Sequence, residues 1–192
     1  MTSNSSNKIG HVAIIMDGNS RWARQRNLKT IEGHKQGVNR LRDIVRYSAK
    51  SEITHLSVFA FSTENWKRSA SDVSDLMKLF LQSIIKEVPE LIENKVQLNF
   101  IGDIPRFSKS LVSQINSAMK DTQAKKPNLN LNIAISYGGR WDILNAIKRL
   151  KDQQINIDKI NEEDFSNLLS TSNFPDPDLL LSLIHISEPT RP

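Results

Sequence analysis

An apolar run that stops at an acidic residue constrains this chain more than any other feature. The run extends from His11 to Met16, Asp17 ends it, and Gly18 follows directly. We expect a buried strand that delivers Asp17 to its C-terminal tip and then turns into a helix, because ligands of open α/β sheets bind at the carboxyl ends of strands. The glycine allows a tight turn and a close approach of the backbone to a ligand.

The residues that follow Asp17 predict an anion site. Amide groups at the start of the next helix would point at an anion, and Arg21 adds a planar positive group of fixed geometry. A carboxylate beside an anion is repelled unless a divalent cation lies between them. The pattern therefore indicates a Mg²⁺-phosphate or Mg²⁺-diphosphate site. An Asx-turn with a helix cap accounts for the same spacing equally well.

Composition narrows the class of protein. The chain has 192 residues, enough for one domain, and contains no cysteine, which fits a reducing compartment and a cytoplasmic location. Residues 1–8 are expected to be a disordered polar start, not a signal peptide, and no apolar run approaches the roughly 20 residues of a membrane span. The net charge is +5, but the basic residues form no stripe interleaved with aromatics, so we expect no nucleic-acid partner.

Strand-like and helix-like segments alternate along the chain. This alternation predicts an α/β fold with a central, largely parallel sheet flanked by helices. The expected strands are 10–16, 55–61, 96–101, 129–136 and a fifth that starts at 179, and the expected helices include 33–50, a long one from about 72, 108–124 and 162–169. We expect Asp72 to cap the long helix, and Pro89 to bend or split it because proline removes a backbone hydrogen bond.

Three predicted strand tips carry polar clusters, at 17–19, 62–65 and 137–140, and parallel strands bring such tips to one edge. In the second cluster, hydroxyl groups and Arg68 would hold diphosphate oxygens, and Asn65 would orient a reacting group. Glu64 would fix Asn65 or an arginine. A loop with a helix cap and a packing tryptophan is an equal alternative.

Three further features admit two interpretations each. His34, at a helix start, would donate to a phosphate oxygen with help from the helix dipole, although a solvated histidine at an exposed helix end is the better interpretation of this residue alone. Arg140 follows two glycines in a turn that we interpret as structural, and we expect it to pair with an acid of the first loop. The apolar stripe 73–92 is either ordinary core or an apolar tunnel. The helix that follows the turn at 137–142 should direct Ile143, Ile147 and Leu150 inward.

Five ordered motifs together resemble the cis-prenyltransferase family over about residues 8–181. They are HVAIIMDGNxRWA, GHK, FSxENWxR, GDxxRF and NIAxxYGGRWD, at 11–23, 33–35, 61–68, 102–107 and 132–142. The resemblance implies a transferase that adds isopentenyl diphosphate units to an allylic prenyl diphosphate, such as farnesyl diphosphate, with cis stereochemistry. The product would be a long polyprenyl diphosphate, a carrier-lipid precursor for the cell wall. It further implies a homodimer and peripheral membrane contact for product release. A non-catalytic interaction subunit of the same fold is the alternative.

The resemblance also assigns roles to individual residues. Asp17 would be catalytic and would bind Mg²⁺, while Asn65 would accept a proton or orient the acceptor. The remaining positions would contact the substrates: Gly18, Asn19, Ser20, Arg21, Trp22, His34, Ser62, Thr63, Glu64, Trp66 and Arg68.

The chain departs from the family at its end. Ser182 stands where the family has an arginine, and residues 182–192 have no counterpart in the pattern. We therefore expect a cis-prenyltransferase domain over 9–181 that is truncated at its C-terminus, followed by a non-family tail. We also expect this chain to be inactive or nearly so.

Overall fold

Five strands form one sheet in the order β3-β4-β2-β1-β5, and every neighbouring pair is parallel. The computed structural model describes residues 9–182, so the expectations for 1–8 and 183–192 lie outside the described part. The strands are β1 (His11–Ile15), β2 (His55–Ser62), β3 (Val96–Ile101), β4 (Leu129–Tyr137) and β5 (Leu179–Ser182). The predicted α/β fold is confirmed.

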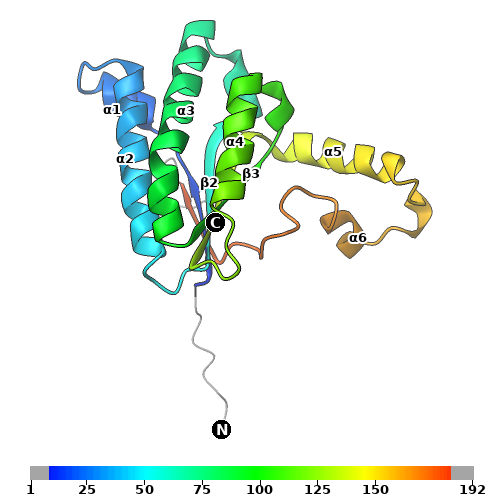
Figure 1. Cartoon of the computed structure of the whole chain (residues 1–192). Helices are drawn as coiled ribbons and strands as arrows, with labels where there is room; N and C mark the ends of the chain where they lie inside the picture. The colour runs from blue at the N-terminus through cyan, green and yellow to red at the C-terminus, as the bar shows by residue number, and fades with distance from the viewer. Residues whose placement is uncertain (1–8, 183–192) are drawn as a thin grey trace, which may run out of the picture.

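Helices fill the connections between the strands. They are α1 (Asn19–Arg24), α2 (Thr30–Ser48), α3 (Ala70–Glu93), α4 (Lys109–Asp121), α5 (Gly139–Asp152) and α6 (Glu162–Ser166), with short turns η1 (Thr63–Lys67), η2 (Ile104–Arg106) and η3 (Ile157–Lys159). Helices α2, α3 and α4 lie side by side over one face of the sheet (Figure 1). Within residues 9–182, no helix combines the length and apolar character that crossing a membrane needs.

Alternate residues of the strands point at these three helices and form the core. On β3 and β4 the core residues are Val96, Leu98, Phe100, Leu129, Leu131 and Ile133, all of them buried. The intervening positions carry a polar row, in which fully buried Asn132 donates to the Ser57 hydroxyl at 3.3 Å and accepts from Asn99 at 3.0 Å. Buried polar groups need such partners, so the row fixes the register of the central strands.

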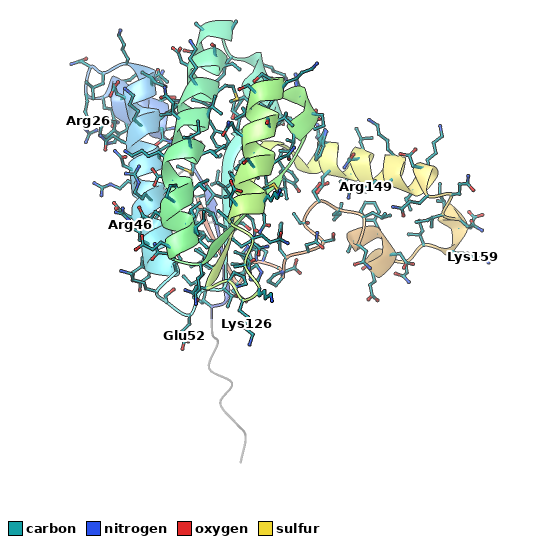
Figure 2. All side chains as sticks on the ribbon, in the orientation of Figure 1. Arg26, Arg46, Glu52, Lys126, Arg149 and Lys159 are labelled. Atoms are coloured by element: carbon teal, nitrogen blue, oxygen red, sulfur yellow. The ribbon has the colours of Figure 1, made fainter. Side chains whose placement is uncertain are left out.

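Helices α5 and α6 extend away from the sheet as an arm, which Figure 2 marks with Arg149 on α5 and Lys159 near the far end. A separate small core of Ala146, Leu150 and Leu168 holds the arm together. Leu150 faces inward as expected, but Ile143 and Ile147 are each 47% exposed, so that part of the prediction is wrong. Helical spacing shows which residues share a face, not whether another element covers it.

The start and the middle of α3 also differ from expectation. Ser69 caps the helix, and its hydroxyl accepts from the Asp72 amide at 3.2 Å, so Asp72 lies in the first turn. The helix continues through Pro89 without splitting. Proline leaves the carbonyl four residues earlier without its usual donor. That residue, Ile85, is 55% exposed, so water can satisfy its carbonyl.

Candidate functional site

The carboxyl ends of β1, β2 and β4 bring three polar segments to one edge of the sheet. Asp17 follows β1, η1 follows β2, and Gly138 follows β4. The Met16 amide donates to the Phe59 carbonyl at 3.2 Å, and Ser62 lies opposite Tyr137 in the ladder. The convergence predicted from the polar strand tips is therefore present in the structure.

The loop after β1 turns sharply at Gly18, whose φ is 84°. This left-handed conformation is accessible to glycine without strain. The Gly18 amide donates to Asp17 Oδ1 at 2.5 Å, and α1 begins at Asn19 without a side-chain cap. The helix-cap interpretation of Asp17 is thus wrong for α1, and the carboxylate stays half-buried at the loop.

Asp17 lines a cavity of about 520 Å³. The loop and α1 form one side of it, α2 forms another, and the end of β5 closes a third. Its wall combines the carboxylate and Asn19 with apolar side chains, including Ile14, Met16, Trp22, Leu41, Ile44 and Leu181. A cavity with few polar groups and a large apolar lining suits an amphipathic ligand.

Two glycines of α2 allow α1 to pack closely against that helix. A Cβ at Gly33 would lie 2.0 Å from the Asn19 carbonyl oxygen, and a Cβ at Gly37 would lie 2.7 Å from Asn19 Nδ2. At Gly33 the neighbour is backbone, so only a residue without a side chain allows this approach, whereas at Gly37 the neighbour is the movable end of the Asn19 side chain. The position of the loop after β1 therefore depends on the glycines at the start of α2.

His34 lies in the second turn of α2, because the helix begins at Thr30 and not at the predicted residue 33, so this histidine is not at the helix start. Its Nε2 atom is buried and has no hydrogen-bond partner among residues 9–182. Burial lowers the pKa of His34, the positive charge of Arg68 lowers it further, and Asp72 opposes the shift. The interpretation as a solvated histidine is wrong, because the structure buries this nitrogen. An unsatisfied buried ring nitrogen favours a polar ligand, and the nearby arginine favours an anionic one.

The turn η1 is fixed by its own side chains. Asn65 Oδ1 accepts from the Ser62 amide at 3.0 Å, and the Ser62 side chain accepts from the Asn65 backbone, which completes a capping box. A backbone amide requires an oxygen acceptor, so the orientation of the Asn65 amide is determined. Its carbonyl is engaged inside the turn, and its NH₂ group remains to meet a ligand.

Trp66 anchors η1 to the tip of β4. Its Nε1 donates to the Ser136 hydroxyl at 2.9 Å, and the Arg106 guanidinium lies 4.5 Å from the centre of its ring. Ser136 is fully buried and has a φ of 48°, a conformation that non-glycine residues rarely adopt. Gly138 leaves space for the Thr63 side chain, because a Cβ at Gly138 would lie 2.6 Å from Thr63 Oγ1.

The charged residues at this edge differ from expectation in two cases. The pKa of Glu64 is lowered by its own backbone amide and by the hydroxyls of Ser62 and Thr63, so its carboxylate is not held by Asn65 or by an arginine. Arg140 is exposed and forms no ion pair within the described residues, which contradicts the expected pairing with the first loop. Arg21 and Arg68 are also exposed and are available to an anion.

The single carboxylate at the loop suits a magnesium ion that is shared with a substrate, and it does not suit a metal ion held by protein ligands alone. Residues 9–182 contain no group of three or more His, Asp or Glu side chains that could hold a metal ion. Mg²⁺ is typically bound through one or two carboxylates together with substrate phosphates and water. A single half-buried carboxylate at the mouth of a cavity satisfies that requirement.

Sequence reasoning missed a second polar cluster behind the site. Buried Asp142 accepts from the Tyr137 hydroxyl at 3.0 Å and from the Ser170 hydroxyl at 2.6 Å. Burial, together with Asp142, raises the pKa of Tyr137 to about 12, so the phenol stays protonated. This cluster ties the start of the arm to the sheet. Tyr137 and Asp142, five positions apart in the 132–142 motif, were its only signal, and both lay in the segment that we interpreted as structural.

Comparison with known proteins identifies relatives over most of the chain. Residues 15–191 match a protein family described as "Putative undecaprenyl diphosphate synthase". The farnesyl-diphosphate-specific ditrans,polycis-undecaprenyl-diphosphate synthase of Haemophilus influenzae is 43% identical over 175 residues, which cover 89% of this chain and 73% of that protein. The isoprenyl transferase of Neisseria meningitidis serogroup A is 43% identical over 171 residues, covering 89% and 68%.

The fold is shared with a solved structure of known ligand. The lavandulyl diphosphate synthase of Lavandula x intermedia, crystallised with dimethylallyl diphosphate, superposes with a TM-score of 0.86 and 33% identity. The match covers 93% of this chain and 78% of that one. The similarity thus extends over the sheet, the helices that cover it, and the edge where the polar segments meet.

Proposed function

This chain belongs to the cis-prenyltransferase family, and from that premise we propose that its own site condenses isopentenyl diphosphate onto an allylic diphosphate such as farnesyl diphosphate. The observation that carries the proposal is the cavity at Asp17, whose lining is mostly apolar but includes the Asp17 carboxylate and a few other polar groups, among them Arg40 on α2. An allylic diphosphate likewise combines a charged head with an apolar tail. The names of the curated relatives agree with this substrate class.

The polar residues at the sheet edge would bind the diphosphate head. The amide of Asn19, the guanidinium of Arg21 and the unpartnered Nε2 of His34, in the tautomer that protonates it, would supply donors. Gly18, Ser20 and Trp22 belong to the same loop. Asp17 would hold Mg²⁺, which when bound neutralises charge that develops on the leaving diphosphate. Donors that are already in position stabilise such charge without reorganisation.

The turn after β2 would meet the second substrate. The hydroxyls of Ser62 and Thr63, exposed Arg68, and the outward NH₂ group of Asn65 lie along it, with Glu64 and Trp66 completing the turn. Because the Asn65 oxygen already accepts from the Ser62 amide, Asn65 would donate a hydrogen bond and orient a reacting group. It would not itself accept the proton that a carbon of the isopentenyl unit loses when the new double bond forms.

We also propose an oligomeric state and a location for the protein. Ile143, Leu144 and Ile147 form an exposed apolar face on α5, with 47%, 60% and 47% exposure, and we propose that a second copy of the chain covers it in a homodimer. Sedimentation of Leu144→Glu against the unmodified protein tests the dimer, and equal masses would contradict it.

We place the reaction in the cytoplasm, which the cysteine-free sequence fits, with peripheral membrane contact when a long apolar product leaves.

Asp17→Ala tests the function. The departure from the family at Ser182 leads us to expect at most a low turnover of this chain. We expect the unmodified protein to bind farnesyl thiodiphosphate in the presence of Mg²⁺, and the Asp17→Ala variant to lose about 100-fold in the incorporation of labelled isopentenyl diphosphate that the unmodified protein shows. Near-normal turnover in the variant would contradict the role of Asp17. Analogue binding that is unchanged in Asp17→Ala, together with no incorporation by the unmodified protein, would instead favour the non-catalytic interaction subunit.

A further inference from the structure

A second cavity lies between α2, α3 and the sheet. Its volume is about 100 Å³, below the range of roughly 300–1,000 Å³ that is typical of ligand pockets. Its wall is apolar over most of its surface, with Val38, Leu41, Val45, Phe80, Ile84 and Leu91 from the two helices. Leu41 also borders the cavity at Asp17, so one side chain separates the two spaces.

Two arginine–glutamate pairs interrupt this apolar wall. Arg42 Nε donates to Glu87 Oε2 at 2.7 Å, and its Nη2 donates to the other carboxylate oxygen. Arg46 Nη2 donates to Glu90 Oε2 at 2.8 Å, and its Nε donates to Oε1. Both arginines belong to α2 and both glutamates to α3, so every one of these bonds crosses the seam between the two helices.

The pairs lie at the end of the cavity that is remote from the candidate site. At 1.5 Å of rise per residue, Arg42 and Arg46 lie roughly 12 and 18 Å along α2 from His34. Figure 2 shows Arg46 on α2 far from Arg26 and the α1 loop. The side chains of the inner pair are 22% and 20% exposed, and those of the outer pair 50% and 32%, so the outer pair borders solvent.

The geometry of these pairs makes them stronger than ordinary surface ion pairs. A guanidinium that meets a carboxylate through two parallel bonds gains both energy and a fixed orientation. The aliphatic stems of the arginines continue the apolar wall while their charged ends close it. The pair between Lys78 and Asp75 on the surface of α3, at 3.9 Å and largely exposed, has neither property.

An apolar chain can enter this cavity only if the cavity grows. The sheet side of the wall is rigid, because Leu98 and Leu131 lie on hydrogen-bonded neighbouring strands and are almost fully buried. The seam between α2 and α3 is the side that can open. The two pairs are the polar contacts that oppose such opening, so they control how much space an apolar chain obtains.

We propose that Arg42–Glu87 and Arg46–Glu90 form a latch between α2 and α3 that sets the length of apolar chain the cavity holds. The inference rests on the proposed function only in that a growing prenyl chain supplies the occupant. When the latch is closed, the chain stops at the paired side chains. When it is broken, the seam opens and a longer chain fits.

Charge reversal tests the latch. Arg42→Glu and Glu87→Arg each place like charges across the seam, whereas the two changes together restore an opposite pair. We expect each single variant to bind the neutral fluorescent probe N-phenyl-1-naphthylamine about tenfold more tightly than the unmodified protein. The combined variant should return to the original affinity. Arg46→Glu with Glu90→Arg repeats the test at the more exposed pair, where the risk of unfolding is lower.

Two controls locate the effect. Lys78→Glu makes the same charge change on α3 outside both cavities and should leave probe binding unchanged. Ile84→Phe fills the cavity between the helices and should abolish the gain of Arg42→Glu. Equal probe affinity in the single and combined variants, or an equal gain in Lys78→Glu, would overturn the latch.

Product analysis separates the latch from the proposed function. With isopentenyl diphosphate and farnesyl diphosphate, the single variants should make products longer by one or more five-carbon units, and the combined variant should restore the original length. Products of the same length from the unmodified protein and from all of these variants would overturn the latch. If no variant elongates while probe binding follows the predicted pattern, the proposed function fails and the latch stands.

Discussion

The loop after β1 and the turn after β2 lie at the same edge of the sheet but are held in opposite ways. The first is positioned through its backbone, because Asn19 packs against Gly33 and Gly37 while the Asp17 carboxylate accepts only from the neighbouring Gly18 amide among the described residues. The second is positioned through its side chains. The capping box and the bond from the Trp66 indole to the tip of β4 hold it.

This difference determines what each segment offers a ligand. Glycine contacts hold the first loop, so its carboxylate stays available for a metal or a substrate. In the second turn, the Asn65 carbonyl, the Trp66 indole and the hydroxyls of Ser62 and Thr63 are already engaged, so the amide NH₂ of Asn65 and the guanidinium of Arg68 remain for a ligand. Two halves of one site can thus combine an adaptable charged loop with a rigid turn that orients its partner.

Gly33→Ala should displace the loop after β1 and should have the largest of the expected effects. A Cβ at this position would lie 2.0 Å from the Asn19 carbonyl oxygen, so α1 must move away from α2. We expect the free energy of unfolding to fall by about 3 kcal/mol, as in other overpacked sites. Urea denaturation measures this, and farnesyl thiodiphosphate binding should be lost in parallel.

Gly139→Ala is the matched control for this change. A Cβ there meets nothing within 4 Å, and the residue starts α5. The substitution should raise the free energy of unfolding by about 0.5 kcal/mol, because it reduces the freedom of the unfolded chain. A similar loss in both variants would show that the α1–α2 contact does not hold the loop.

Sequence patterns predicted the elements of this fold more completely than their contacts. Alternating apolar residues predicted β3 at 96–101, where the structure also has it, because that alternation reflects burial of one strand face. The same reasoning assigned Ile143 and Ile147 to a core that does not cover them. A pattern shows which residues share a face, but the distance between two elements depends on the rest of the fold.

The candidate site shows the same limit. The meeting of the polar strand tips was predictable, because parallel strands bring their carboxyl ends to one edge of the sheet. The role of Gly33 was not, since it depends on how closely α1 approaches α2. The orientation of Asn65 follows from the dihedral angles of the turn, which no local spacing of residues specifies.

Substitutions at Asn65 separate holding the turn from meeting the ligand. Asn65→Ala removes the oxygen that caps the Ser62 amide and should lower the free energy of unfolding by about 1.5 kcal/mol. Asn65→Asp keeps an acceptor oxygen and should stay within about 0.5 kcal/mol of the unmodified protein. Both variants lose the outward NH₂ group, so turnover should fall in both. Normal turnover in Asn65→Asp would contradict the donor role.

Ser136 tests how rigidly the second turn is anchored. Ser136→Ala leaves the half-buried Trp66 indole without its acceptor and should lower the free energy of unfolding by about 1 kcal/mol. Ser136→Gly loses the same bond but relieves a φ of 48°, which gains about 1 kcal/mol, so its stability should match that of the unmodified protein. Denaturation of both variants distinguishes the lost bond from the relieved strain. Equal stabilities of the two would show that the backbone at Ser136 is not strained.

The smallest effect that we expect is a pH dependence at His34. Burial and then Arg68 lower the pKa of this histidine in the folded protein, so the unfolded chain binds the proton more tightly. Stability should therefore be complete above the unfolded value of about 6.5 and should fall as the pH drops below it. The His34→Gln variant should lack this part of the acid sensitivity when urea denaturation is compared between pH 7 and pH 5.

The same histidine should couple protons to the anion that the first loop binds. A diphosphate beside its unpartnered Nε2 favours the charged imidazolium, so binding should take up protons and tighten as the pH falls from 7 towards 6. Calorimetry of inorganic pyrophosphate binding in two buffers of different ionisation enthalpy measures the uptake. His55→Gln is the control, because burial also lowers the pKa of His55, but this residue starts β2 at the opposite edge of the sheet. Proton uptake that survives His34→Gln and disappears in His55→Gln would place the anion away from the loop after β1.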